Sequence, residues 1–137
     1  MKILLTLLLS ICLWADQTAA FLEALSGYYD NDPSNDARTI TLLRKEALAG
    51  NNDAAYLLGA AYDNGVLVRG SCTEALRWYE LAAKRSDSDA QMQTAWHYYR
   101  SSGCPHNIET AYRWFLKAAE AGEVEAQRML ELLEEGF

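Results

Sequence analysis

Basic residues are scarce in this chain of 137 residues. Lysine and arginine together number 12, against 19 aspartate and glutamate residues, so the formal net charge is −7. A surface of this sign repels phosphate groups, which argues against nucleic acid and anionic membranes as partners and favours a basic protein partner. Half of the residues are apolar, which excludes a disordered chain and suffices for one continuous core.

Long apolar runs are absent except at the N-terminus, where Ile3–Trp14 forms a run of 12 residues that is too short to span a bilayer. With Lys2 before it and small residues after it, the run is typical of a secretion signal, and cleavage after Ala15 or after Ala20 satisfies the small-residue rule. We therefore expect export to the periplasm or exterior of a Gram-negative bacterium, without a membrane span. Removal of residues 1–15 takes away one lysine and no acid, which changes the net charge to −8.

Catalytic motifs are also lacking: the sequence has no phosphate-binding loop, no serine nucleophile elbow and no CxxC spacing. Cys72 with Cys104 and His106 offers only three ligands for zinc, and the short separation of His106 from Cys104 does not place its imidazole on the sulfur. We therefore expect no catalytic residue, metal or other cofactor, and a protein that is not an enzyme.

What the sequence does contain is a repeat of 36 residues. Ala54, Ala90 and Ala126 follow one another at this spacing, as do Trp78 and Trp114. The same register relates Tyr62 to Tyr98, Ala75 to Ala111, Tyr79 to Phe115, and Ala82-Ala83 to Ala118-Ala119. A unit of this size cannot bury its own apolar face and must stack on its neighbours. The period therefore predicts an all-α fold, a short right-handed α-solenoid of helix-turn-helix repeats.

Each unit is predicted to contain a helix A and a helix B joined by a glycine-bearing connection. In the first unit, helix A covers 54–63 and helix B covers 74–85, with Asp53 and Thr73 as their N-caps. The whole chain divides into a signal peptide at 1–15, a degenerate N-terminal helical cap at 16–52 with helices at 21–29 and 36–49, repeats at 53–88 and 89–124, and a C-terminal capping helix at 125–137.

Large aromatic residues that recur in register are expected in the core, where they fill the space between small residues that let the helices approach. These core residues are Tyr62, Trp78, Tyr98 and Trp114.

The chain has three cysteines. Cys72 and Cys104 lie in the predicted connections of successive units, which stacking brings side by side, so we expect a disulfide between them in an oxidising compartment. Cys12 lies inside the apolar run, and lipidation there stays open as an alternative, although Ile11 is larger than the residue that normally precedes a lipidated cysteine.

The repeat resembles the Sel1-like repeat family. The resemblance rests on 54–62 followed by 74–83, on 90 followed by 109–119, and on the Trp-aromatic-x-x-Ala-Ala pattern within both B helices. It implies a helix-turn-helix solenoid related to tetratricopeptide repeats, with the A helices lining a concave surface for protein partners. Some cysteine-rich members have been discussed as penicillin-binding or hydrolysing proteins, but this chain lacks their cysteine pair in every repeat.

Helical phase predicts which residues of the A helices point away from the core. An exposed methionine, tryptophan and tyrosine on one helical face is unusual for a monomer and suits a protein-binding hot spot; the alternative is that Trp96 and Tyr99 pack against a neighbouring helix. The expected partner-binding residues are Tyr56, Asp63, Met92, Trp96, Tyr99 and Arg100.

These observations favour an exported, non-enzymatic module for protein–protein interaction. An immunity or inhibitor protein against a secreted effector, a structural envelope component and a β-lactam hydrolase of the cysteine-rich kind remain as alternatives.

Overall fold

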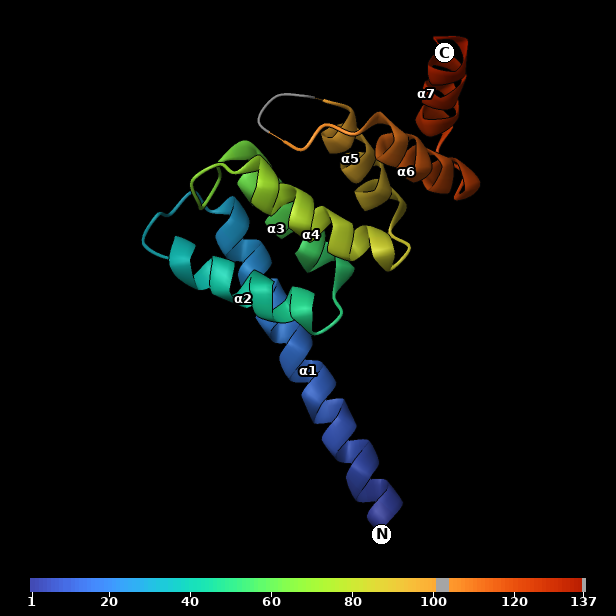
Figure 1. Cartoon of the computed structure of the whole chain (residues 1–137). Helices are drawn as coiled ribbons and strands as arrows, with labels where there is room; N and C mark the ends of the chain where they lie inside the picture. The colour runs from blue at the N-terminus through green and yellow to red at the C-terminus, as the bar shows by residue number, and fades with distance from the viewer. Residues whose placement is uncertain (101–103, 137) are drawn as a thin grey trace.

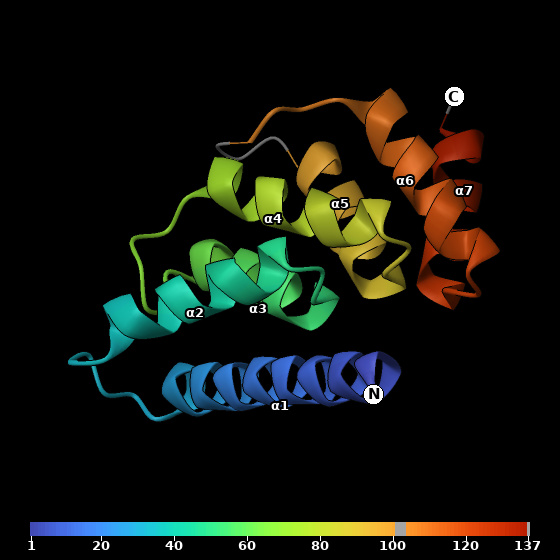
Figure 2. The same cartoon turned by 90° about the horizontal axis from the view of Figure 1, so that it is seen from below.

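A computed structural model describes residues 1–100 and 104–136, and within these residues it contains seven α-helices and no strand. The helices are α1 (Lys2–Tyr29), α2 (Asp36–Leu48), α3 (Asn52–Asn64), α4 (Cys72–Lys84), α5 (Ser88–Tyr99), α6 (Ile108–Glu120) and α7 (Val124–Glu135). Each helix packs against the next one along the chain, and the helices succeed one another from α1 at one end of the molecule to α7 at the other (Figures 1 and 2). The predicted all-α solenoid is confirmed.

The helix α1 is longer than expected. A separate helix over 21–29 is wrong, since one helix runs without interruption from Lys2 to Tyr29. Neither glycine nor proline occurs before Gly27, so nothing in the intervening sequence breaks the helix. Only its C-terminal part packs, with Ala24 and Gly27 buried against α2, and the rest of the helix projects from the body of the molecule (Figure 1).

By length and composition, α1 is apolar enough to cross a membrane, with a mean hydropathy of 1.6 over its most apolar window. A secretion signal near the N-terminus is equally apolar, so the hydropathy of α1 is compatible with a secretion signal as well as with a membrane-spanning helix.

The N-caps lie two residues before the expected positions. The side chain of Asn51 accepts a hydrogen bond from the Ala54 N–H at 3.1 Å, and the hydroxyl of Ser71 accepts one from the Glu74 N–H at 3.3 Å. Both capping residues have extended backbones, which a cap requires. Asp53 and Thr73, the predicted caps, instead lie inside the first turns.

The caps recur with the repeat period. Asp87 caps α5 through the Ala90 N–H at 2.8 Å, and Asn107 caps α6 through the Thr110 N–H at 2.9 Å. Each is 36 residues from its counterpart, Asn51 or Ser71. The two repeats therefore share the caps of α3 to α6 as well as their core.

The core contains the two repeated tryptophans. Trp78 is 4% exposed and Trp114 is 8% exposed, and the adjacent Tyr79 and Phe115 are buried with them. Gly59 lets α3 approach α4 closely, since a Cβ atom at this position would lie 2.7 Å from the Tyr79 ring.

Tyr62 and Tyr98, which we expected in the core, pack against it but are only half-buried. Their rings pack against the core while their hydroxyls reach polar groups at its edge. The Tyr98 hydroxyl donates to Glu80 Oε1 at 2.6 Å, and the Arg44 guanidinium donates to the Tyr62 hydroxyl at 3.3 Å. A buried phenol needs such a partner, which holds these side chains at the boundary.

Candidate functional site

Three residues at the end of α5 form a contiguous group, called the aromatic cluster below: Trp96, Tyr99 and Arg100. The Trp96 and Tyr99 rings meet edge to face with centroids 5.7 Å apart, and the Arg100 guanidinium lies 5.0 Å from the Trp96 ring centroid. On its other side, Trp96 packs against Phe115 of α6 at 5.2 Å. The cluster is therefore anchored in the core and still reaches the surface.

The exposure expected from helical phase is wrong for Met92, which is only 8% exposed and belongs to the core. Trp96 and Tyr99 are half-buried, and Arg100 is exposed. The prediction assumed that a helix A buries only one narrow face, but α5 packs against both α4 and α6. A helix with a neighbour on either side buries a wider arc, which here includes Met92.

Tyr56 of α3 connects the first repeat to this surface. It is half-buried, with its ring 5.3 Å from that of Tyr79, and its hydroxyl accepts a hydrogen bond from the Gln93 amide at 3.4 Å. Gln93 lies on α5, one turn before the aromatic cluster. The side chains of the two A helices are thus in contact along this face.

The expected disulfide between Cys72 and Cys104 is present, with the two Cα atoms 5.5 Å apart. Cys72 is the first residue of α4, and Cys104 lies in the connection that leads to α6. The bond joins the connections of the two repeats.

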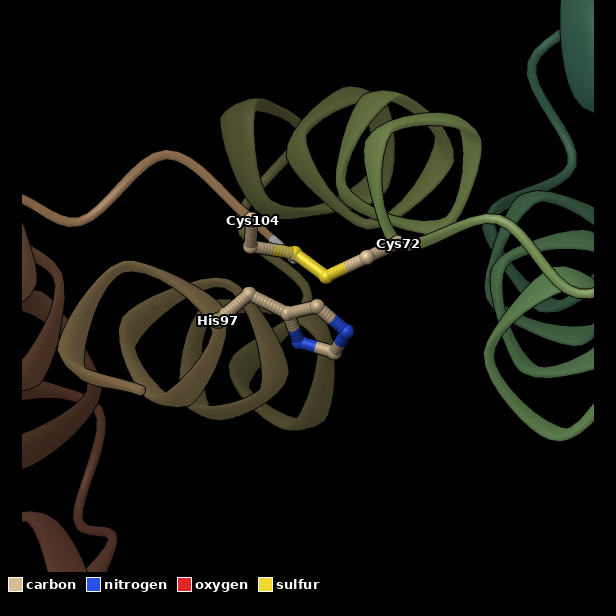
Figure 3. Close-up of side chains that lie close together, drawn as sticks. All are labelled: Cys72, His97 and Cys104. Atoms are coloured by element: carbon tan, nitrogen blue, oxygen red, sulfur yellow. A yellow bond between two sulfur atoms is a disulfide. The ribbon is translucent and has the colours of Figure 1, made fainter. Parts of the chain in front are cut away.

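His97 lies directly against this disulfide (Figure 3). The side chain is buried, and its ring centroid is 5.3 Å from that of Tyr79. Its Nδ1 is 2.7 Å from the Gln93 carbonyl oxygen, and its Nε2 is 3.1 Å from Asp63 Oδ1. Both ring nitrogens therefore face oxygen acceptors, and only a doubly protonated imidazolium can donate to both.

The polar groups around His97 also affect Tyr79. Burial, and then the negative charge of Asp63, raise the pKa of the Tyr79 phenol above its ordinary value. Tyr79 therefore remains a neutral neighbour of His97 throughout the physiological pH range.

A surface cavity of about 320 Å³ gives access to this region. Its lining comprises Asp63, Gly70, Ser71, Cys72, His97 and Arg100. The structure thus brings the expected partner residues Asp63 and Arg100 to one cavity, and through Arg100 it joins that cavity to the aromatic cluster.

Sequence reasoning considered the wrong histidine at the cysteines. His106, two residues after Cys104, is exposed, whereas the ring beside the disulfide belongs to His97. His97 is 25 residues after Cys72 and 7 residues before Cys104, and the spacing matches none of the short zinc-binding motifs considered. Only the stacking of α3, α4 and α5 brings the cysteines, His97 and Asp63 together.

Comparison with known proteins gives one family. The family model described as "Sel1 repeat" matches residues 52–87 and 88–123. Among curated proteins, the chain is 30% identical over 104 residues to chitin synthase regulatory factor 4 of Schizosaccharomyces pombe, an alignment that covers 72% of this chain and 16% of the yeast protein.

Solved structures agree with this match. A Sel1 repeat protein from Oxalobacter formigenes superposes with a TM-score of 0.59 at 29% identity, over 70% of this chain and 38% of that one. The protective antigen c5321 of uropathogenic Escherichia coli gives a TM-score of 0.70 at 28% identity, over 80% of this chain and 24% of that one. Cysteine rich protein B of Helicobacter pylori shares the fold, with a TM-score of 0.66 at 21% identity over 84% of this chain and 95% of that one.

The chain spans only a small part of most of these proteins: 16% of the yeast factor, 38% of the Oxalobacter protein and 24% of c5321. What is shared is the stacked helical repeat.

Proposed function

Because this chain belongs to the Sel1 repeat family, we propose that it is an exported, non-catalytic binding module that holds a protein partner on the surface formed by Tyr56, Asp63 and the aromatic cluster. Repeat arrays of this kind present extended surfaces and commonly serve as protein–protein interaction modules.

The observation that carries the proposal is the aromatic cluster. Tryptophan, tyrosine and arginine are the residues most enriched in binding hot spots. Here they are preassembled by ring contacts and by the Trp96 contact with Phe115, so little side-chain freedom is lost on binding.

The acidic charge of the chain favours a partner with a basic surface. The net charge of −8 after cleavage at Ala15 attracts such a partner over distances beyond direct contact and raises the association rate at low salt.

Export rests on α1. The side chains of residues 2–19 are exposed, whereas burial begins at Ala20 and Phe21. Cleavage after Ala15 would remove the apolar run and leave the packed end of α1 with a polar first turn, whereas cleavage after Ala20 would make Phe21 the first residue. Mass spectrometry of the protein from a periplasmic fraction tests this; a chain that begins at Met1 or is found only in the cytoplasm contradicts export.

A binding experiment tests the surface itself. The chain is used as bait on extract from its own source, and any captured protein is identified and then measured in purified form. A Tyr99→Ala, Arg100→Ala variant should weaken its binding at least tenfold, since hot-spot residues each contribute more than about 1 kcal/mol. Trp96→Ala should do the same, with its helix content checked by circular dichroism because Trp96 also contacts Phe115.

The matched control changes an aromatic residue and an arginine on a B helix. Tyr112 and Arg113 lie on α6, where Arg113 is 70% exposed, and Tyr112→Ala with Arg113→Ala should leave binding unchanged. If the control weakens binding as much as the Tyr99→Ala, Arg100→Ala variant, the partner does not bind at the aromatic cluster.

A further inference from the structure

Cys72, His97 and Cys104 bring three metal-ligating groups together beside the cavity described above, and Asp63 lies against His97. Ligand atoms of Cys72, His97 and Cys104 all lie within 4.8 Å of one another. Asp63 Oδ1 adds a carboxylate 3.1 Å from His97 Nε2. Tetrahedral zinc binds sulfur at about 2.3 Å and nitrogen or oxygen at about 2.0–2.2 Å, so its ligand atoms are about 3.3–3.8 Å apart. In the oxidised chain the two sulfur atoms are bonded to each other, so reduction must separate them before a metal ion can bind both.

The orientation of the imidazole is that of a metal ligand. The short contact of Nδ1 with the Gln93 carbonyl oxygen holds the proton on Nδ1. In the neutral ring, Nε2 then carries a lone pair that faces the lone pairs of the Asp63 carboxylate. Such a contact is favourable when a proton or a metal cation lies between Nε2 and Oδ1. Histidine ligands of zinc are oriented by the same kind of main-chain hydrogen bond.

The disulfide occupies two of these four ligands, so the metal and the disulfide exclude each other. Cys72 lines the cavity and is the first residue of α4, where the helix dipole stabilises a thiolate. Arg100, which also lines the cavity, adds a positive charge. Both effects favour Cys72 as a leaving thiolate when a reductant attacks the bond, whereas the Asp63 carboxylate in the same cavity opposes them.

We propose that this cluster is a redox-gated zinc site: the reduced chain binds one Zn²⁺ through Cys72, Cys104, His97 Nε2 and Asp63, and the oxidised chain does not. A dithiol reductant transfers two electrons and two protons to the disulfide and becomes a disulfide itself. The two cysteine thiols then bind Zn²⁺ and release two protons. In the reverse direction, a disulfide oxidant accepts two electrons from the zinc-bound thiolates, the bond between Cys72 and Cys104 re-forms, and Zn²⁺ leaves.

This site adjoins the proposed partner surface and shares Asp63 and Arg100 with it. Its consequence is that either state ties the connections of the two repeats together, by a covalent bond or by a metal ion. The reduced chain thereby keeps the fold that the disulfide otherwise holds.

The test uses the full chain in a mild detergent with Cys12→Ser, which leaves only the two cysteines of the cluster. The chain is reduced with a phosphine, which is then removed under nitrogen, and Co²⁺ is added as a spectroscopic probe for zinc. One Co²⁺ per chain should bind with the intense visible bands of tetrahedral cobalt and a thiolate-to-cobalt charge-transfer band, and one equivalent of Zn²⁺ should abolish both. The oxidised chain should show neither band.

Variants separate this site from adventitious binding. Asp63→Ala should retain the charge-transfer band and weaken Zn²⁺ binding by more than about 10-fold, since loss of a ligand should cost at least as much as loss of a group that only orients one. Cys72→Ser should abolish the tetrahedral spectrum, and His106→Ala should change nothing, since His106 is exposed and outside the cluster.

Zinc should also raise the thermal unfolding temperature of the reduced chain and leave that of the oxidised chain unchanged. The proposal is overturned if the reduced chain gives only the weak spectrum of octahedral cobalt. It is equally overturned if Asp63→Ala binds Zn²⁺ as tightly as the parent chain.

Discussion

The Nε2 atom of His97 on α5 lies 3.1 Å from Oδ1 of Asp63 on α3, and this contact joins the A helices of the two repeats. The His97 side chain is 9% exposed and that of Asp63 is 37% exposed, so water screens the contact only in part. In the oxidised chain the pair therefore couples the stability of one repeat to that of the next.

A double-mutant cycle measures this coupling. The stabilities of Asp63→Ala, His97→Ala and the double variant are measured by urea unfolding. The interaction energy from the cycle should be about 0.5–1.5 kcal/mol, the range for one hydrogen bond at a partly buried position. Asp63→Ala combined with His106→Ala serves as the control and should be additive. An interaction energy near zero for the His97 cycle would show that the contact does not form in solution.

The disulfide should contribute more than any single polar contact. Closing the loop between Cys72 and Cys104 reduces the entropy of the unfolded chain, so Cys72→Ser with Cys104→Ser should lower the free energy of unfolding by about 3–4 kcal/mol. Urea unfolding in the presence of a chelator, which keeps metal away from the remaining ligands, gives this value. Cys12→Ser, outside the folded body, should leave it unchanged. Equal stability of the double variant and the parent would mean that the bond adds nothing to folding.

The close approach of α3 and α4 predicts that one added methyl group is costly. In Gly59→Ala the new Cβ would lie 2.7 Å from the Tyr79 ring, which is itself buried, so α3 or the ring must move. We expect a loss of about 1–3 kcal/mol, as for other overpacked cores, although alanine is the better helix former.

The second repeat supplies the matched control for this substitution. Ala95 lies 36 residues after Gly59 and is fully buried. In its repeat, Phe115 takes the position of Tyr79. Ala95→Gly should lose about 2 kcal/mol, about half through helix propensity and half through one lost methyl contact. A stabilising effect of Gly59→Ala in thermal unfolding would contradict the tight contact.

The 36-residue period predicted much of this fold because residues that recur at this spacing are buried at equivalent positions of the stacked repeats. It located the helices, the buried Trp78 and Trp114, and the two connections that bring Cys72 to Cys104. It failed for Met92, because helical phase within a single helix does not say how many neighbours that helix has.

The candidate zinc cluster was beyond sequence reasoning for a related reason. Its histidine and carboxylate come from different helices, and neither Asp63 nor His97 recurs in the other repeat: the matching residues are Tyr99 and Ala61. A residue that differs from its counterpart in the other repeat can be recognised in the sequence. The side chains that it contacts, however, depend on how adjacent repeats stack. The N-caps were misplaced by two residues because Asn51 and Asp53 are both good capping residues, and the backbone alone decides between them.

The buried phenol of Tyr79 and the half-buried phenol of Tyr98 predict that the protein loses stability in alkaline solution. Burial, and then the hydrogen bond that the hydroxyl donates to Glu80, raise the pKa of Tyr98 from 10.0 to about 12, and burial also raises the pKa of Tyr79. Above pH 10 the unfolded chain has lost these protons while the folded chain keeps them. The unfolded state then binds fewer protons, so the free energy of unfolding falls as the pH rises.

The stabilisation from Tyr98 should therefore be complete below about pH 10 and lost by about pH 12. Urea unfolding at a series of pH values, followed by circular dichroism, measures the slope. Tyr98→Phe removes one titrating group and one hydrogen bond, so this variant should be about 1 kcal/mol less stable at neutral pH and should lose less stability between pH 10 and 12. Parallel pH profiles for Tyr98→Phe and the parent chain would mean that the Tyr98 hydroxyl is not held by Glu80.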